Sequence, residues 1–290
     1  MRHWASSLTV ALMLAAALPP LAAAARIGGT GTAERRPAEP QIGPEAEVGV
    51  FAALCRFSHA APDDPIVHPG MPGMSHLHDF FGNVTTDDSS TYESLRAGGT
   101  TCRLPQDASG YWVPTLLRDG APVTPLAAKI YYRAARGAAT AAIQPPPPGL
   151  RMVAGDSMAT APQPGHVTFW SCRGMIGQAS ETPPNCPSDA PLDLHVRLPD
   201  CWDGENLDSA DHKSHMAYGR QGACPADHPV PLPKLALIVH YPITGDPGGV
   251  SLASGGVYSG HADFFNAWDQ PFLAARVENC LQALVRCGQL

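Results

Sequence analysis

The stretch that decides the fold is LDLHVRL, residues 192–198, in which apolar and polar side chains alternate without interruption. In an extended strand the apolar side chains share one face, and Asp193, His195 and Arg197 share the other. We expect the polar face to be either a solvated outer surface or the wall of a polar cleft. A second run, LALIVHY at 235–241, is apolar on both faces and predicts a central strand.

Shorter runs of the same kind recur between loops rich in Pro and Gly, beginning with VGVFAALCRF at 48–57. Near the C-terminus the apolar period changes to three and four residues, which predicts an amphipathic helix over about 271–285. Many short strands with few helices are typical of a mainly β fold. We expect an antiparallel β-sandwich, jelly-roll-like, with long loops and a C-terminal helix. The other predicted strands are 111–117, 129–133, 151–154 and 167–172.

The N-terminus has the pattern of an export signal, because an apolar run at 8–21 is followed by small residues that include Ala22, Ala23 and Ala24. No later run reaches about 18 apolar residues, so no membrane anchor is expected. We therefore expect a secreted, extracellular protein. The predicted organisation is a signal peptide at 1–25, a flexible leader at 26–47 and a single domain at 48–290.

The charge balance narrows the classes of partner. The chain has 19 Lys and Arg against 26 Asp and Glu, a formal net charge of −7. A negative surface disfavours binding to nucleic acid and to anionic membranes. We expect neither partner, and we expect a monomer.

The chain has eight cysteines, all of which follow the predicted signal. An even number in an exported protein favours disulfides, whereas thiolate ligation of a metal is disfavoured because no CxxC pair occurs. Eight cysteines allow 105 connectivities, so the pairing stays open. The cysteines are Cys55, Cys102, Cys172, Cys186, Cys201, Cys224, Cys280 and Cys287.

Three stretches carry most of the chemically usable side chains. CWDGENLDSADHKSHMAY at 201–218 is the densest, and its Gly, Asn and Asp-Ser steps predict a loop. SHLHDFFGN at 75–83 and SGHADFFNAWD at 259–269 each place His and Asp beside paired Phe. We expect the three stretches to line one His/Asp-rich cleft, because binding groups are often carried on loops of a rigid scaffold.

A metal site is the first hypothesis for this cleft. If 76–78 is extended, alternation places His76 and His78 on one face, and His261 is the expected third ligand. Imidazole ligands suit a divalent transition metal such as Zn or Cu. His215 and Asp263 are expected to be further ligands or groups that orient one. The alternative is that these histidines are only hydrogen-bonded braces of long loops.

A carboxylate pair is the second hypothesis. Glycoside hydrolysis needs an acid and a base or nucleophile, and Asp203 or Asp211 could supply one member with Asp263 as the other. Alternatively, such aspartates cap turns through their own backbone. A third hypothesis is proton abstraction by His215 with cationic stabilisation by Lys213, as in a polysaccharide lyase.

Aromatic side chains could contact a sugar through their ring faces. Trp202 and Trp268 are flanked by polar residues and are the preferred candidates, with Tyr218 at the end of the polar stretch. Trp112 and Trp170 lie in strand-like runs and are expected in the core.

The motifs together resemble a known family. CWDGENLDSADHKSHMAY, GYWVPTL, PPPPGLRMVAGD and SHLHDFFGN are similar to the DUF1996 family of secreted fungal and bacterial proteins, over about 55–280. The resemblance implies a polysaccharide context without naming a reaction. We expect a protein that acts on extracellular or cell-wall carbohydrate, as a metal-dependent hydrolase or lyase. The alternative is a non-catalytic glycan-binding or cell-wall structural protein.

Overall fold

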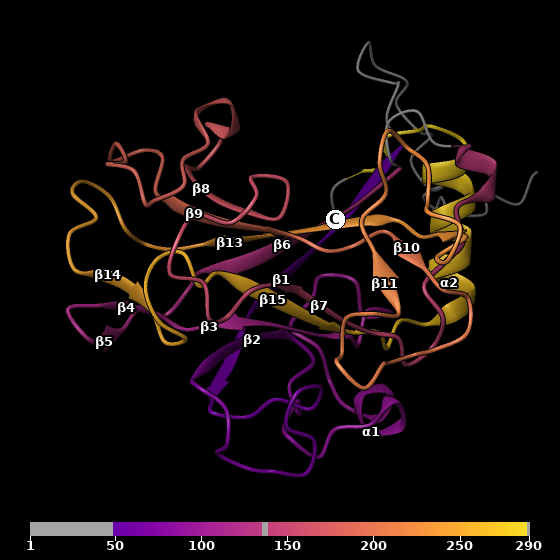
Figure 1. Ribbon diagram of the computed structural model, residues 1–290, viewed down its shortest axis with the longest axis horizontal. Coiled ribbons are helices and arrows are strands. Elements are labelled where there is room, and N and C mark those ends of the chain that lie inside the picture. The colour runs from indigo at the N-terminus through magenta and orange to yellow at the C-terminus, as the bar shows by residue number, and fades with distance from the viewer. Residues whose placement is uncertain (1–48, 135–138, 289–290) are drawn as a thin grey trace, which may run out of the picture. The chain divides into compact units, whose positions relative to one another are not determined.

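The computed structural model describes residues 49–134 and 139–288, so the predicted signal peptide and leader lie outside the described residues. Two antiparallel half-sheets form the body of the fold, and the C-terminal helix lies at one end of them (Figure 1). The strands are β1 Val50–Ala61, β2 His78–Gly82, β3 Gly110–Pro114, β4 Leu116–Arg118, β5 Ala121–Pro122, β6 Ala127–Arg133, β7 Arg151–Gly155, β8 Thr168–Cys172, β9 Leu192–Arg197, β10 Cys201–Trp202, β11 Met216–Ala217, β12 Val230–Pro231, β13 Lys234–His240, β14 Val250–Leu252 and β15 His261–Phe265. The helices are α1 Tyr92–Ala97 and α2 Gln270–Arg276, with 3-10 turns at Thr140–Ala142 and Ile176–Gln178.

Strand β1 joins the two halves of a nine-stranded sheet of order β7-β15-β3-β2-β1-β6-β13-β9-β8. The part from Val50 to Arg56 pairs with β6, and the part after it pairs with β2. The register shifts between Phe57 and His59, where the strand passes from one half to the other. A bulge of this kind bends a strand and increases its twist.

The sheet folds back on itself, because β9 contacts both β7 and β15 across the interior. Figure 1 shows β8, β9, β13 and β6 above β15, β7, β3 and β2. One large cluster of buried side chains fills the space between the halves, including Phe81, Tyr111, Leu194, Leu237 and Phe264. This packing is that of a β-sandwich.

A second cluster covers the outer face of β2, β3 and β15. Phe80, Trp112 and Phe265 project from these strands and pack against Ile66 of the preceding loop and Leu95 of α1. Because both faces of β2 and β15 are covered, every residue of the two strands is buried. Each buried Phe stabilises the fold by about 1.5–3 kcal/mol.

The helix ends follow from local sequence. Thr91 caps α1, since its hydroxyl accepts the amide N–H of Ser94 and the Ser94 hydroxyl accepts that of Thr91. Asp269 caps α2 by accepting the amide N–H of Phe272, and Pro271 fits the first turn, where its missing N–H costs nothing. The last helix then continues as a π-helical segment, Val277–Gln282.

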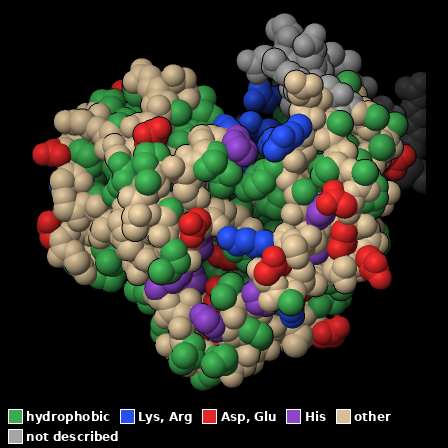
Figure 2. Space-filling view, in the orientation of Figure 1, with side chains coloured by type: hydrophobic (Ala, Val, Ile, Leu, Met, Phe, Trp, Pro, Cys, Tyr) green, Lys and Arg blue, Asp and Glu red, His purple; other side chains and the backbone are tan. Residues whose placement is uncertain are grey.

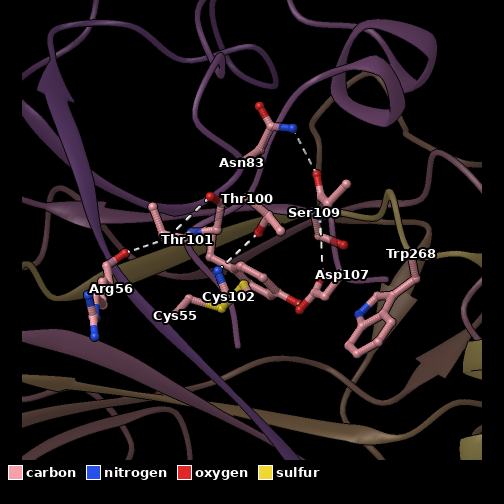
Figure 3. The surroundings of a disulfide bond; sticks show 12 residues. Cys55, Arg56, Asn83, Thr100, Thr101, Cys102, Asp107, Ser109 and Trp268 are labelled. Carbon is pink, nitrogen blue, oxygen red and sulfur yellow. Dashed lines mark hydrogen bonds between the residues drawn. A yellow bond between two sulfur atoms is a disulfide. The ribbon is translucent and has the colours of Figure 1, made fainter. Parts of the chain in front are cut away.

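Four disulfides hold the loops, and all eight cysteines are paired. Figure 3 shows the Cys55–Cys102 bridge, which joins β1 to the loop before β3. Cys201–Cys224 closes the polar stretch at 201–218, and Cys280–Cys287 closes the end of the last helix. The Cys172–Cys186 bridge follows β8.

The mainly β, antiparallel, disulfide-stapled fold with a C-terminal helix is thus confirmed. One alternative for 192–198 is wrong: Asp193 and His195 are 2% and 5% exposed, so this polar face is not solvated. His195 bonds the hydroxyl of Ser171 and its ring stacks on Phe169. Within 49–134 and 139–288, no helix is long and apolar enough to cross a bilayer.

Candidate metal centre

Three histidines from two distant parts of the chain meet on the outer face of one half-sheet. His78 begins β2 and His261 begins β15, and β3 lies between the two strands. Phe80 and Asp263 both pair with Trp112 of β3. Since neighbours across a ladder share a face, His78 and His261, two residues before Phe80 and Asp263, project to that same face. Histidine side chains gather over β2 and β3 in Figure 2.

The Nε2 atoms of the three rings converge. The distance is 3.1 Å between Nε2 of His76 and His261, and 3.4 Å between Nε2 of His78 and His261. Ligand atoms of all three residues lie within 4.8 Å of one another. Zn–N bonds of 2.0–2.1 Å in a tetrahedral site separate two nitrogens by about 3.3 Å. The spacing therefore fits three nitrogen ligands of one ion.

Backbone carbonyls fix the tautomers of two of these rings. Nδ1 of His78 donates to the carbonyl of Asp63 at 3.0 Å, and Nδ1 of His261 donates to the carbonyl of Ser259 at 2.9 Å. A carbonyl only accepts, so both Nδ1 atoms carry the proton and both Nε2 atoms present lone pairs. Histidines that ligate metals show this arrangement, with the second nitrogen bonded to a carbonyl or carboxylate.

Burial keeps these imidazoles neutral. Desolvation, followed by the neighbouring ring of His76, lowers the pKa of His78 to about 3. Desolvation and then the ring of His78 lower the pKa of His261 to about 3. Desolvation also lowers the pKa of His76, although the charge of Asp64 opposes this. At neutral pH the rings can thus bind a cation without first losing a proton.

No hydrogen-bond donor of a described residue lies between the Nε2 lone pairs of His78 and His261. His76 can donate one N–H to His261, but among the described residues the one hydrogen-bond contact of Nε2 of His78 is then the Nε2 lone pair of His261. Buried polar atoms are normally paired, and a bound cation would satisfy all three nitrogens at once.

Two carboxylates extend the cluster. Asp64 and Asp263 form, with His78, a second group whose ligand atoms lie within 4.8 Å of one another. Both carboxylate oxygens of Asp263 are buried and lack a hydrogen-bond partner among the described residues. Burial, followed by the charge of Asp64, raises the pKa of Asp263 well above its usual value. Asp64 is held in place because its Oδ1 accepts the amide N–H of Ile66 and Val67.

A glycine allows the close packing beside His261. Gly155 of β7 pairs with His261 and has φ of 88°, in the left-handed region. A Cβ there would lie 2.6 Å from the carbonyl oxygen of Gly260 and 2.9 Å from Cα of His261. Lys213 reaches the same place, since its Nζ donates to the carbonyl of Gly155 at 2.7 Å.

A pocket of about 230 Å³ adjoins this edge of the site. In Figure 2 a Lys or Arg side chain lies in the hollow of this face, with acidic side chains beside it. The pocket carries polar groups and one aromatic ring, which are the features of a small-molecule site. Its lining includes Val153, Gly155, Gln163, Lys213, Met216 and Tyr218.

His215 lies apart from the three converging histidines. It is 1% exposed, its Nε2 donates to the carbonyl of Arg151 at 2.7 Å, and its Nδ1 bonds Ser209. These bonds tie the polar stretch to β7. Both ring nitrogens are therefore occupied by the fold, and no described metal-ligand group includes His215.

Asp203 and Asp211 form turns within the polar stretch. Oδ1 of Asp203 accepts the amide N–H of Glu205 and Asn206. Oδ1 of Asp211 accepts the amide N–H of Lys213 and Ser214. These bonds favour the ionised form and lower the pKa of Asp211 far below its usual range. A carboxylate held in this way is a poor general acid.

The three aromatic candidates lie in different surroundings. Trp268 is fully buried, its Nε1 donates to the hydroxyl of Tyr132, and its ring stacks on Phe272, so no ring face is open to a sugar. Trp202 is half-buried and donates to the carbonyl of Asn206. Tyr218 lines the pocket beside Lys213. Trp112 and Trp170 are in the core, as predicted.

Two features of the site could not be identified from the residue pattern. The stretches at 75–83 and 259–269 were expected as loops, but five residues of each form strands β2 and β15. Asp64 was not among the candidate site residues. The DDP sequence at 63–65 signals a turn, and nothing local indicates that one carboxylate points to His78.

Comparison with known protein families gives a match. The family described as "Domain of unknown function (DUF1996)" matches residues 64–268. This range contains the three histidines and both carboxylates of the site. No curated protein and no solved structure matches the chain.

Proposed function

The chain belongs to the DUF1996 family, whose function is unknown, and we propose that it binds a divalent transition metal through Nε2 of His76, His78 and His261 and uses this centre to cleave extracellular polysaccharide. The observation that carries the proposal is the facing pair of lone pairs on His78 and His261 at 3.4 Å. The bonds of both rings to backbone carbonyls pre-orient these nitrogens.

The ligand set favours Zn or Cu. Three neutral imidazoles suit these ions, and three protein ligands leave a coordination position for water or substrate. Such an ion polarises a bound oxygen and lowers the pKa of bound water. Asp263 is the side chain best placed to hold a proton beside it, because neither of its oxygens has a hydrogen-bond partner within 49–134 and 139–288.

Carbohydrate is the proposed substrate class. Four disulfides fit an oxidising, extracellular compartment, as does the predicted signal peptide. The pocket next to His261 offers Tyr218 for ring contact and Lys213 for hydroxyl groups. Sugars are commonly bound by such a combination of an aromatic face and hydrogen-bonding side chains.

The test is turnover on a panel of neutral and acidic polysaccharides. Metal-free protein, protein loaded with Zn(II) or Cu(II), and the His78→Ala variant are compared with the Arg118→Gln variant, whose exposed guanidinium on β4 lines neither the metal centre nor the adjoining pocket. We expect product only with loaded wild type and loaded Arg118→Gln. Equal turnover by the metal-free protein or by loaded His78→Ala contradicts the proposal.

A non-catalytic glycan-binding protein is the second candidate. The observation that favours it is that Asp203 and Asp211 are bonded within their own loop, and that both ring nitrogens of His215 are bonded, one to Ser209 and one to the carbonyl of Arg151 on β7. Glycan binding by wild type and by His78→Ala, with no product from any form, supports this second function and excludes the first.

A further inference from the structure

A second pocket lies on the outer face of the other half-sheet. It measures about 450 Å³, a size typical of small-molecule sites. The pocket is bordered by β1, β6 and β13, whereas the histidine site lies over β2, β3 and β15. Its lining includes Leu54, Arg103, Leu126, Lys129, Arg173 and His240.

The fold places these cations side by side. Lys129 of β6 pairs with Leu54 of β1, and His240 of β13 pairs with Ala127 of β6, so their side chains share the outer face. The backbone of Arg103 is held beside β1, because the preceding residue, Cys102, forms a disulfide with Cys55 of that strand (Figure 3). The amide N–H of Arg103 also donates to the carbonyl of Leu54 at 2.9 Å.

One buried carboxylate balances only part of this charge. Asp193 is 2% exposed, accepts from Nδ1 of His240 at 2.7 Å and lies 3.6 Å from Nε of Arg173. Arg103 and Arg173 are permanent cations, so two guanidinium charges face one carboxylate. This excess occurs in a chain with a formal net charge of −7.

Guanidinium N–H groups in the pocket lack acceptors. Nε and Nη2 of Arg173 are buried and have no hydrogen-bond partner within the described part of the chain. The exposed guanidinium of Arg103 likewise has no ion pair or hydrogen bond to another described residue. Buried donors without acceptors are costly, and an oxyanion would supply acceptors for both side chains.

We propose that this pocket binds a small molecule through an oxyanion, a carboxylate, sulfate or phosphate group held between Arg103 and Arg173. Lys129 adds a third positive charge near the anion. Leu54 and Leu126 provide apolar surface for the uncharged part of the ligand. This site is separate from the metal centre and does not depend on the proposed function.

The test is calorimetric titration of the full chain at low ionic strength with inorganic phosphate, sulfate and glucuronate, and with glucose as a neutral probe. We expect saturable binding of at least one of the three anions, weakened by added salt, and none of glucose. The anion that binds most tightly identifies the source of the oxyanion. Glucuronate would indicate an acidic sugar, and phosphate or sulfate would indicate the inorganic ion or its ester.

Three variants make the result specific. Arg173→Gln and Arg103→Gln should each weaken the binding at least about tenfold, the effect of losing one charge-assisted hydrogen bond. Arg103 is exposed, so its replacement leaves the fold intact even if loss of Arg173 disturbs Asp193. Arg118→Gln, an exposed arginine of β4, should bind as wild type does. Absence of saturable binding for all three anions, or equal binding by Arg103→Gln and wild type, overturns the proposal.

Discussion

The Nε2 atoms of His78 and His261 face each other at 3.4 Å although each ring donates its other nitrogen to a backbone carbonyl. Two lone pairs at this distance repel unless a positive charge lies between them. Burial lowers the pKa of both rings to about 3, so a proton does not supply that charge at neutral pH. The proposed metal ion would supply the positive charge between the two nitrogens.

Asp263 should affect metal affinity and metal-free stability in opposite directions. Asp263→Asn removes a buried carboxylate with no partner, so the metal-free variant should be more stable than wild type by about 1–3 kcal/mol. The same change should weaken Zn(II) binding about 10- to 100-fold. Denaturant unfolding and metal titration measure the two effects. Asp189→Asn, which replaces an exposed carboxylate, is the control and should change neither quantity. A loss of metal-free stability in Asp263→Asn, or Zn(II) affinity equal to that of wild type, would contradict this role for Asp263.

Gly155→Ala should be destabilising. Alanine at φ of 88° is strained, and its Cβ would meet the carbonyl of Gly260 at 2.6 Å. We expect a loss of about 1–3 kcal/mol in the free energy of unfolding, with weaker metal binding because His261 must move. Gly165→Ala is the matched control, since no atom lies within 4 Å of its Cβ position. Equal stabilities of the two variants would show that β7 adjusts without strain.

Asp107 should make the protein less stable as the pH rises. Burial raises the pKa of this carboxyl from its ordinary value to about 7, although Tyr111 and Ser109 donate hydrogen bonds to it. The folded state then binds more protons than the unfolded state between about pH 4 and 7, so stability is present below pH 4 and is lost as the pH rises through 7.

Asp107→Asn tests this dependence. Wild type should lose on the order of 4 kcal/mol of unfolding free energy between pH 4 and 8 through this carboxyl, and the variant should not show this loss, as measured by urea unfolding. Asp189→Asn, an exposed carboxylate, should keep the decline of wild type. The same slope in wild type and Asp107→Asn would exclude this carboxyl as the cause.

Substitutions of Trp268 and Trp202 should differ in their effects on the free energy of unfolding and on glycan binding. Trp268→Phe leaves the Tyr132 hydroxyl without its indole donor in the core, and we expect a loss of about 2–3 kcal/mol in unfolding free energy with glycan binding unchanged. Trp202→Ala should change unfolding less, because that ring is half-buried. Weaker glycan binding by folded Trp268→Phe would reverse the assignment of this residue to the core.

The alternating and doubly apolar runs were sufficient to predict the strands at 192–198 and 235–241, because their period is independent of context. The strands at 78–82 and 261–265 were not predicted. HDFFG and HADFF are short and carry polar residues. Their outer faces are buried because Ile66 and Leu95, from other segments of the chain, pack over Phe80 and Phe265. Their burial is tertiary, so no local period signals it.

The convergence of His76, His78 and His261 was expected, since alternation linked the first two and the HADFF stretch supplied the third. The carbonyls of Asp63 and Ser259 that fix the tautomers are backbone groups, and side-chain patterns carry no information on them. Asp203, Asp211 and His215 shared the same polar stretch, but their bonds serve the turns of that stretch and its attachment to β7.

Metal content of the purified chain is the most direct test of the central claim. After loading with Zn(II) or Cu(II) and dialysis, we predict one tightly held ion per chain, with affinity at least about 100-fold lower in His78→Ala and in His261→Ala. His166→Gln should bind as wild type does. An ion held equally well by His78→Ala, His261→Ala and wild type, or no ion held by wild type, would contradict the account.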